Sequence, residues 1–456
     1  MTVIPLRHKG VALGALGLSA ALLVAPLARG EETAGKKAAV AASYTLADLP
    51  LAAFQNSKLP GSISNDRKIL LGSIGSDLWR GPGDAEGEFW MITDRGPNGQ
   101  IKVGGENRRT FPVPEFSPAI LRVKADAGTI RILDVIPIVT RSGKPVTGMP
   151  NSEGRDETPY DYTAQKKLAF NPNGLDTEGL VRTASGAFWV VEEYGPSLLK
   201  IDAGGKVLKR YVPRGVRLEG ADYEVAPALP AIFGRRKINR GFEGLAMSGD
   251  EKTLYLALQS PLLNPDKKTG DASRQTRILA FDVAGEKVTA EYAYRFDAVK
   301  EFDPAHGAPD EMKVSSVVWI NPGALLVLER TDWVAKIYRV DLGAAVNILG
   351  TRWDDPAASP SLEALDITNA GEFTPLVKTL VVDLGRLDGV PEKIEGVAVI
   401  DAATIAVAND NDFDIGDFDA GGDNAGKGTK NRILKIALPG PLPLAPPSER
   451  QALSLP

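Results

Sequence analysis

Residues Asn239–Ser260 read NRGFEGLAMSGDEKTLYLALQS and contain a unit that recurs along the chain. A carboxylate beside a glycine, Glu243-Gly244, opens a short apolar run, and a second apolar run ends on the amide Gln259 after a polar turn. Two short apolar runs around a polar turn predict a β-hairpin. Because the strands of a hairpin are antiparallel, Glu243 and Gln259 are expected to be neighbours.

The same pattern recurs in four further places. They are DTEGLVRTASGAFWVVEEY (Asp176–Tyr194), SSVVWINPGALLVLERTD (Ser315–Asp332), KIEGVAVIDAATIAVANDND (Lys393–Asp412) and the looser GSDLWRGPGDAEGEFWMITDRG (Gly75–Gly96). A lone hairpin cannot bury its apolar faces, so the copies are expected to stack radially with their first strands around a channel. The predicted fold class is all-β, a β-propeller of five or six blades with long inter-strand insertions.

The ends of the chain suggest how it is divided. Residues 1–30 have the features of a Sec-type signal peptide: a positive start, an apolar run from Val11 to Leu27 and small residues at Ala28-Arg29-Gly30. The alternative is a membrane anchor, for which this run is short. We predict a linker at 31–42, a propeller domain at 43–438 and a Pro-rich disordered tail at 439–456. The protein is expected to be periplasmic or secreted, with no stable membrane span after signal cleavage.

Three segments outside the hairpins carry further expectations. Tyr44–Phe54 and Ile69–Ile74 are predicted strands, and the first is expected to close the ring by pairing with Ile433–Leu438. The polar stretch Arg141–Asn173 is predicted to be a lid, an insertion, a disordered segment or part of a sixth blade. The aromatics at strand period, Phe89, Trp90, Phe188 and Trp189, are predicted to be core.

The composition excludes several kinds of chemistry. The chain of 456 residues has a net charge of −5, which gives no general reason to expect a nucleic-acid partner, and it has no cysteine. Its two histidines are His8, in the signal, and His306, on a loop, so a multi-histidine zinc site is excluded. No G-x-S-x-G elbow occurs, and His306 is expected to be solvated rather than a catalytic base.

Carboxylates remain, and they stand at equivalent strand ends. The candidate metal ligands are Asp94, Asp176, Glu178, Glu193, Glu243, Glu329, Glu395, Asn409 and Asp410. Carboxylates gathered on one rim raise one another's pKa or recruit a cation, and oxygen ligands select Ca²⁺ before Mg²⁺. The run from Asn409 to Asp423 lacks EF-hand spacing because its glycine, Gly416, comes one position late. Asn409–Asp412 is assigned to the rim, and the rest of the run is predicted to be an acidic loop that binds Ca²⁺ weakly.

Arginines stand among these acids and suit phosphate or carboxylate oxygens. We predict a catalytic set of Glu243, Glu193, Arg240 and Arg330, and a substrate-binding set of Arg95, Arg240, Arg330 and Tyr194. The expected partner is a small anionic ester, most plausibly a phosphate, with a metal ion that polarises it. Purely structural ion pairs between blades are the alternative for any one of these residues.

Six motifs in order carry a resemblance to a known family: NPNGLDTEGL, GAFWVVEEYGPSLLKID, NRGFEGLAM, LVLERTD, IEGVAVI and NDNDF. From Gly72 to Leu438 the chain resembles the family described as esterase-like activity of phytase, the phytase-like domain of secreted bacterial proteins. The resemblance implies a β-propeller, export, and calcium-assisted hydrolysis of an ester or phosphomonoester. It maps onto Asp94-Arg95, Asp176, Glu178, Glu192-Glu193, Arg240, Glu243, Glu329-Arg330, Glu395 and Asn409–Asp412. Ser315-Ser316 departs from the pattern, which argues against a symmetric metal ring.

Two other functions remain open from the residues. One is a non-catalytic periplasmic binding or scaffold propeller whose calcium is structural, and the other is a lactonase-like hydrolase with one catalytic calcium and no arginine collar. A catalytic ion leaves open coordination positions, whereas a structural ion is fully ligated by protein. The protein is expected to be a monomer.

Overall fold

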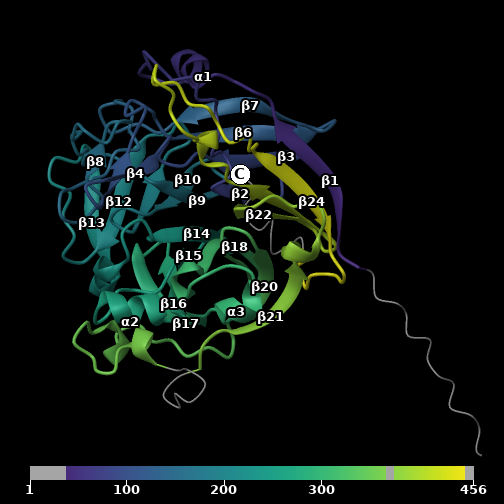
Figure 1. Cartoon of the computed structure of the whole chain (residues 1–456). Coiled ribbons are helices and arrows are strands. Elements are labelled where there is room, and N and C mark those ends of the chain that lie inside the picture. The colour runs from purple at the N-terminus through teal and green to yellow at the C-terminus, as the bar shows by residue number, and fades with distance from the viewer. Residues whose placement is uncertain (1–36, 366–373, 447–456) are drawn as a thin grey trace, which may run out of the picture. The chain divides into compact units, whose positions relative to one another are not determined.

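Five antiparallel groups of strands follow one another around a common channel (Figure 1). In this computed structural model residues 37–365 and 374–446 are described, and all belong to one compact unit, Lys36–Pro456. The first strands contact one another in a closed ring whose order is β2 (Asp77–Trp79), β9 (Thr177–Arg182), β14 (Phe242–Met247), β18 (Lys313–Asn321), β22 (Ile394–Asp401) and β2 again. Such a ring is the architecture of a β-propeller, so the predicted fold class is confirmed.

Each first strand is followed outward by three more. The first group adds β3 (Glu88–Ile92), β6 (Ala119–Asp126) and β7 (Thr129–Pro137), and the second adds β10 (Phe188–Glu192), β11 (Ser197–Ile201), β12 (Val207–Pro213) and a parallel fifth strand, β13 (Glu224–Leu229). The third adds β15 (Thr253–Leu258), β16 (Gln275–Asp282) and β17 (Lys287–Arg295). The fourth adds β19 (Ala324–Arg330), β20 (Ala335–Asp341) and β21 (Val377–Asp383). The fifth adds β23 (Thr404–Asn409), β24 (Arg432–Ala437) and β1 (Ala39–Leu46).

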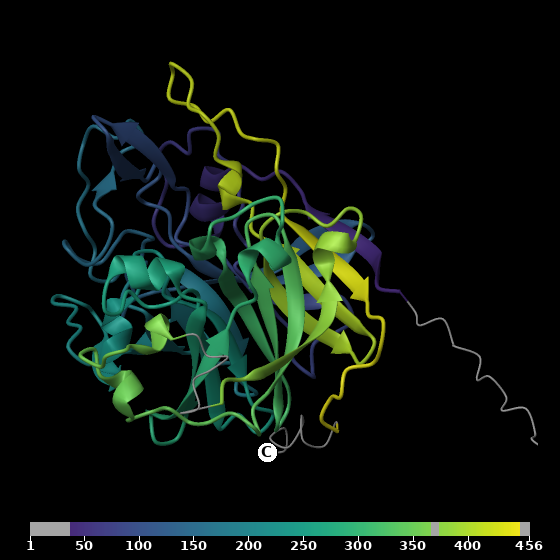
Figure 2. The same ribbon diagram turned by 60° about the horizontal axis from the view of Figure 1, so that its bottom comes forward.

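The fifth group joins the two ends of the described chain. Strand β1 pairs antiparallel with β24, so that Tyr44 lies opposite Ile433, which confirms the expected ring closure. The same strand meets β7 in parallel over two residues, which links the fifth group to the first. Figure 2 shows the fourth group (green) beside the fifth (yellow) as separate twisted sheets.

The segment around β1 differs from its prediction in two ways. The strand begins at Ala39, inside the predicted linker, and the second half of the predicted strand Tyr44–Phe54 is helix α1 (Leu51–Lys58). The helix buries Leu51, Phe54 and Gln55. Residues buried at spacings of three and four lie on one face of a helix. One of them is the polar Gln55, so the buried face is not apolar throughout and the sequence does not indicate a helix clearly. The Gln55 side chain donates to the Glu115 carbonyl within the core.

Insertions between strands lie outside the five groups. Strands β4 (Gly99–Val103), β5 (Glu106–Thr110) and β8 (Pro159–Tyr160) form a small sheet. The stretch 141–173 contributes only β8 to a named strand, so it is an insertion and supplies no sixth blade among the described residues. Two other short helices are α2 (Lys267–Ala272) and α3 (Val299–Phe302).

The core lies between neighbouring blades. Trp189 packs against Tyr211 of its own blade and against Phe281 of the next blade, with ring centroids 5.9 and 6.1 Å away. The four aromatics that were predicted to be core are all buried.

The prediction for the tail is wrong in its first half. Leu442 is buried in the cluster between the fourth and fifth blades, and its N–H donates to the Ala402 carbonyl at 2.7 Å. The prolines around Leu442 led to the prediction of a disordered tail, although this leucine packs on the blades. Residues 447–456 and the predicted signal peptide, 1–30, lie outside the described residues. Within the described ranges, no helix combines the length and apolar character that a membrane crossing requires.

Candidate metal centre at the channel rim

Hairpin geometry brings the start of each first strand to the end of the second strand. Backbone N–H groups at the second-strand ends donate to carbonyls just before the first strands, in the pairs Asp94 to Ser73 (3.0 Å), Glu193 to Asp176 (3.0 Å), Gln259 to Gly241 (2.8 Å) and Asp410 to Lys393 (2.9 Å). In the fourth blade Lys313 and Arg330 are register partners. These repeated contacts place all five strand ends on one rim of the channel.

Five carboxylates from the first three blades form the acidic sector of this rim: Asp94, Asp176, Glu178, Glu193 and Glu243. They make two overlapping triads, Asp94–Asp176–Glu178 and Glu178–Glu193–Glu243, in each of which one oxygen per residue lies within 4.8 Å of the others. None of the five is more than 9% exposed. Glu178 belongs to both triads and is therefore the centre of the acidic sector.

The acidic sector has few partners inside the protein. Among the described residues, the Glu178 carboxylate has no hydrogen bond or ion pair, and neither carboxylate oxygen of Asp176 has a hydrogen bond. Asp176 is paired only with Arg95, at 3.1 Å, a contact close enough for charge attraction but without hydrogen-bond geometry. Glu193 accepts one bond, from the Gly241 N–H at 3.2 Å.

Burial and crowding shift the protonation of these groups. Desolvation, together with the Glu193 and Glu192 charges, outweighs Arg95 and raises the pKa of Asp176 to about 7. Desolvation and the Glu243, Asp94 and Glu193 charges raise the pKa of Glu178 well above its usual value. Glu193 and Asp94 are shifted in the same direction, again mainly by burial, so their pKa values are raised too.

The acidic sector fits a hard divalent cation. Buried carboxylate oxygens without hydrogen-bond donors are costly unless the groups are protonated or bound to a cation. The donor set holds only oxygen ligands, which Ca²⁺ and Mg²⁺ prefer. Glu178, Asp176, Asp94, Glu193 and Glu243 are the residues that would hold it.

Four basic residues form the cationic sector over the third to fifth blades: Arg240, Lys313, Arg330 and Lys393. Lys313 and Lys393 stand two residues before Ser315 and Glu395, as Asp176 stands before Glu178, so each points to the same side as its partner. Sequence reasoning missed both lysines, although this period-2 spacing was available. Lys313 pairs with Asp332 at 2.5 Å, and burial with the nearby Arg330 and Arg240 charges lowers its pKa to about 8.

Arg330 explains why the fourth blade lacks a glutamate. Its Nε donates to Ser315 Oγ at 2.7 Å, and Ser315 in turn donates to Glu243 at 3.1 Å. Its Nη2 pairs with Glu395 and lies 3.7 Å from Glu243. The small serine leaves room for a guanidinium, so this blade adds a positive charge where its neighbours add a negative one.

Several predicted ligands are not in the acidic sector. Glu329 is the clearest case: it faces away from the channel and accepts bonds from Tyr294 Oη at 2.7 Å, Lys378 at 2.5 Å and the Asp297 N–H. Successive strand residues point to opposite faces, so once Arg330 points inward Glu329 cannot. Its placement on the rim is wrong.

Three other predicted ligands have partners already. Asn409 uses its side chain on the Asp410 and Lys430 carbonyls and the Arg432 N–H, within the fifth blade. Glu395 and Asp410 do lie on the rim, but each contacts a cationic side chain: Glu395 contacts Arg330, and Asp410 contacts Lys393 at 3.3 Å. The structure thus places these two beside the cationic sector.

Arg95 and Tyr194, predicted to bind substrate, are enclosed by the 141–173 insertion. Arg95 is 4% exposed and pairs with Glu157 and Asp176, both at 3.1 Å. Tyr194 is 3% exposed and donates to the Gly148 carbonyl at 2.5 Å. Arg240 is half-buried and donates to Ser260 at 3.4 Å, so of the predicted arginines it is the one that solvent reaches most readily.

Below the rim Asp77 bridges three of the first strands, β2, β9 and β18. This residue stands in the looser first copy where three other blades have glycine, and it accepts bonds from the Leu180 N–H at 3.0 Å and Ser316 Oγ at 2.9 Å. Burial, with a smaller contribution from the Glu243 charge, raises its pKa to about 7. Sequence reasoning missed Asp77 because the first copy was not aligned residue by residue with the others.

Two other predicted features have local roles. His306 donates from Nδ1 to the Asp303 carboxylate at 3.0 Å, and its ring stacks on Trp333. The acidic loop uses its carboxylates on its own backbone: the Asp414 carboxylate accepts from the N–H groups of Lys427, Gly428 and Thr429, and the Asp419 carboxylate from those of Gly421 and Asp423. Figures 1 and 2 show this yellow loop projecting beside the segment after α1, where Lys68 pairs with Asp423 at 2.8 Å.

Comparison with known protein families identifies the group to which this architecture and rim belong. The model of the phytase-like family, described as esterase-like activity of phytase, matches residues 72–413. The chain belongs to the phytase-like family. The match begins just before the first strand of the ring and ends in the rim segment after β23, so it contains every residue of both sectors.

The individual proteins that resemble this chain share little sequence identity with it. An "Uncharacterized secreted protein" of Arthroderma benhamiae (strain ATCC MYA-4681 / CBS 112371) is 27% identical over 303 residues, which are 57% of this chain and 59% of that protein. Among solved structures, regucalcin of Agrobacterium tumefaciens str. C58, titled a calcium-binding protein, is 11% identical with a TM-score of 0.34 and covers 87% of this chain and 97% of its own. A luciferin-regenerating enzyme is 10% identical with a TM-score of 0.33 and covers 80% of this chain and 92% of its own.

Proposed function

We propose that this phytase-like protein is an exported, calcium-assisted hydrolase of phosphate monoesters or related anionic esters. The observation that carries the proposal is the division of one rim into an acidic sector short of partners and a cationic sector beside it. A cation on the first and an anionic ester on the second would be neighbours. Family membership supports the ester class, and the name of the Arthroderma relative supports export.

Each sector has a distinct task in this proposal. Glu178, Asp176, Asp94, Glu193 and Glu243 hold the ion, which when bound would polarise the ester and lower the pKa of a water molecule. Arg240, Lys313, Arg330 and Lys393 attract and orient the anionic group. Arg330 also pairs with Glu395, so its position is fixed before substrate arrives.

Access to the rim is asymmetric. The acidic sector is buried, whereas the Lys393 side chain is 23% exposed and its partner Asp412 is 46% exposed. An anionic substrate would therefore reach the rim over Lys393 and Arg240, the half-buried members of the cationic sector, because Lys313 and Arg330 are buried. In this proposal Lys313, whose pKa burial lowers to about 8, gives a proton to the departing alkoxide near neutral pH.

One observation favours a second candidate, a binding module with a structural ion. The acidic sector is so deeply buried that five carboxylates could ligate an ion without leaving a position for substrate. In that case the ion stabilises the channel and the cationic sector binds an anion without turnover.

The experiment uses the mature protein and its Glu178→Gln variant, with p-nitrophenyl phosphate, p-nitrophenyl acetate and inositol hexakisphosphate, each in Ca²⁺ and in EDTA. We expect calcium-dependent phosphate release in the wild type and at least a 100-fold loss in the variant. Glu329→Gln is the matched control, because its buried carboxylate faces away from the rim and its replacement should leave the calcium dependence intact.

The outcomes separate the candidates. Hydrolysis of acetate alone would move the assignment to a carboxylesterase. An absence of turnover combined with a large EDTA-sensitive fall in Tm, abolished by Glu178→Gln, would identify the structural ion and contradict the hydrolase. An absence of any calcium effect on Tm or activity would contradict both.

A further inference from the structure

The end of the channel opposite the rim holds a cavity of about 440 Å³. It is lined by the later halves of all five first strands and by the turns that follow β2, β9 and β14, whereas the rim is made by the starts of those strands. Asp77, which accepts a hydrogen bond from Ser316 of β18, is one of its lining residues, and no residue of either sector of the rim is among them. The cavity is therefore separate from the two sectors of the rim.

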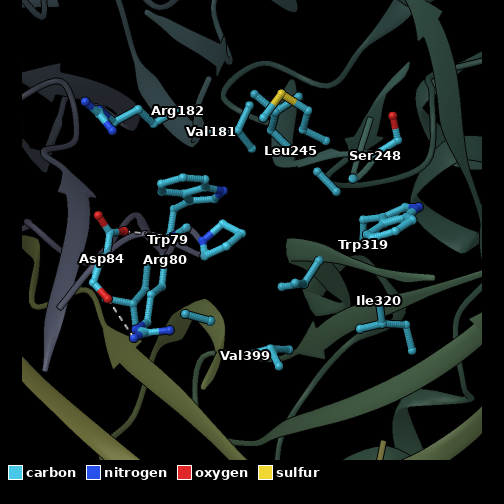
Figure 3. Close-up of a pocket in the computed structure, with 18 of the residues that line it drawn as sticks. Trp79, Arg80, Asp84, Val181, Arg182, Leu245, Ser248, Trp319, Ile320 and Val399 are labelled. Carbon is cyan, nitrogen blue, oxygen red and sulfur yellow. Dashed lines mark hydrogen bonds between the residues drawn. The ribbon is translucent and has the colours of Figure 1, made fainter. Parts of the chain in front are cut away.

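Aromatic and aliphatic side chains dominate its wall. In Figure 3 the indoles of Trp79 and Trp319 stand on opposite sides, with Val181 and Leu245 above and Val399 below. Both indoles are only half-buried, although the propeller core buries most of its other aromatics. A concave, largely apolar space of this size with facing indoles is typical of a small-molecule site.

Acidic and basic side chains both stand at the edge of the cavity, and they differ in how they are partnered. Three acids line the cavity and all are already hydrogen-bonded: Asp77 as described, Asp84 by the Gly81 N–H at 2.7 Å and Trp90 Nε1 at 3.2 Å, and Glu251 by the Ala184 N–H at 2.7 Å. Arg80 and Arg182 also line it, on the Trp79 side in Figure 3.

Neither arginine is neutralised by an acid. Within residues 37–365 and 374–446 neither has an ion pair; Arg80 donates to the Asp84 carbonyl at 2.9 Å, and Arg182 lies over the Trp90 ring at 4.7 Å. Two guanidinium groups without an ion-pair partner among the described residues thus stand beside an aromatic wall.

We propose that this cavity is a second binding site, for an aromatic small molecule that carries one acidic group. The ring system lies between Trp79 and Trp319, and the acidic group is directed toward Arg80 and Arg182. The site is independent of the metal and of hydrolysis at the rim. No residue of the acidic sector lines the cavity, so its ligand does not contact that sector.

The test is fluorescence titration of the mature protein with 8-anilinonaphthalene-1-sulfonate, an acidic aromatic probe, and with N-phenyl-1-naphthylamine, its neutral counterpart. We expect saturable binding of the acidic probe at one per chain and at least fivefold weaker binding of the neutral one. Val399→Trp fills the cavity and should weaken binding at least tenfold. Val377→Trp, the same change at a position that is 53% exposed on β21, should have no effect.

Two further variants test whether the probe binds in this cavity. Met247→Trp also projects into the cavity and replaces Val399→Trp if that variant does not fold. Glu178→Gln should bind the probe as the wild type does, because the rim is separate. The proposal is overturned by non-saturable binding, by binding that a folded cavity-filling variant leaves unchanged, or by equal affinity for the two probes.

Discussion

Arg330 occupies the space that a glutamate fills in three other blades. It contacts Ser315 of its own blade and glutamates of the blades on either side, Glu243 and Glu395. One side chain thus changes the sign of the charge over part of the rim and ties three blades together. The asymmetry that makes separate acidic and cationic sectors begins with this one arginine and one serine.

Replacing Arg330 by Gln should destabilise the protein by about 3–5 kcal/mol, because it leaves two buried carboxylates without their cation. Urea unfolding of the metal-free protein measures the change. Arg339→Gln, at an exposed position of β20, is the control and should change the free energy of unfolding by less than about 0.5 kcal/mol. A similarly small change in both variants would show that the buried Glu243 and Glu395 carboxylates do not need the Arg330 charge for the protein to be stable.

The raised pKa of Asp77 makes the stability of the protein depend on pH. Its ordinary pKa is 3.8 and its folded value is about 7, so between these pH values the folded state holds a proton that the unfolded state has lost. The free energy of unfolding therefore falls as the pH rises through this window and then levels off. Asn keeps an oxygen for the Leu180 N–H but cannot ionise, so Asp77→Asn should gain about 2 kcal/mol relative to wild type between pH 5 and pH 8. The measurement is denaturant unfolding in EDTA at both pH values. If the variant and the wild type differ in free energy of unfolding by the same amount at both pH values, the pKa of Asp77 is not shifted by folding.

At the scale of elements, glycines set how closely the first strands approach. A Cβ on Gly396 would lie 2.6 Å from the Leu78 nitrogen and 2.8 Å from the Asp77 carbonyl carbon, both backbone atoms of the neighbouring strand. Gly179 has the same relation to β14. Backbone cannot move aside as a flexible side chain can, so the ring of first strands depends on these glycines.

Gly396→Ala should therefore cost about 1–3 kcal/mol, as overpacking does in a dense core. Gly83→Ala is the matched control, because no atom lies within 4 Å of its added Cβ and its backbone is not in the left-handed region. Thermal unfolding of the two variants measures the difference. Equal stability of the two would show that the strands can move apart without cost.

The elements also show what a sequence can reveal. The hairpins and their shared rim follow from apolar runs and antiparallel geometry, which are local properties. The choice between Glu329 and Arg330 as the inward residue depends on strand register, and β18 has a shift between Val314 and Ser316 that no local pattern reports. Lys313 and Lys393 were within reach, because their period-2 spacing from Ser315 and Glu395 is visible in the sequence.

Helix α1 and the burial of Leu442 could not be predicted from the sequence. Helix α1 is short, with a buried Gln55 whose hydrogen bonds go to distant backbone, including the Ser117 N–H at 3.0 Å. Leu442 lies among prolines and is buried only because the fourth and fifth blades offer it a cleft. Both depend on contacts with segments far away in the chain.

At the scale of the whole molecule, the propeller is held closed by β1 and β24, from opposite ends of the sequence. Residues Ala39 and Ala437 are opposite one another in this pair. The chain has no cysteine, so a single engineered disulfide there would form without competition.

Joining Ala39→Cys and Ala437→Cys should stabilise the oxidised protein by about 2–4 kcal/mol, because the bond closes a very long loop in the unfolded chain. The Tm should fall back to that of the wild type when a reductant is added. Each single cysteine variant serves as a control and should show no response to reductant. A disulfide that forms but leaves the Tm unchanged would mean that opening of this strand pair does not accompany unfolding.

The pairing of β1 with β24 also has a consequence for biosynthesis. Strand β1 waits for a partner that is made almost four hundred residues later in the chain. A nascent chain that stops before Arg432 has an open ring and an exposed apolar seam, which proteases and chaperones recognise. Strand β1 is therefore covered on this side only in a chain that contains β24.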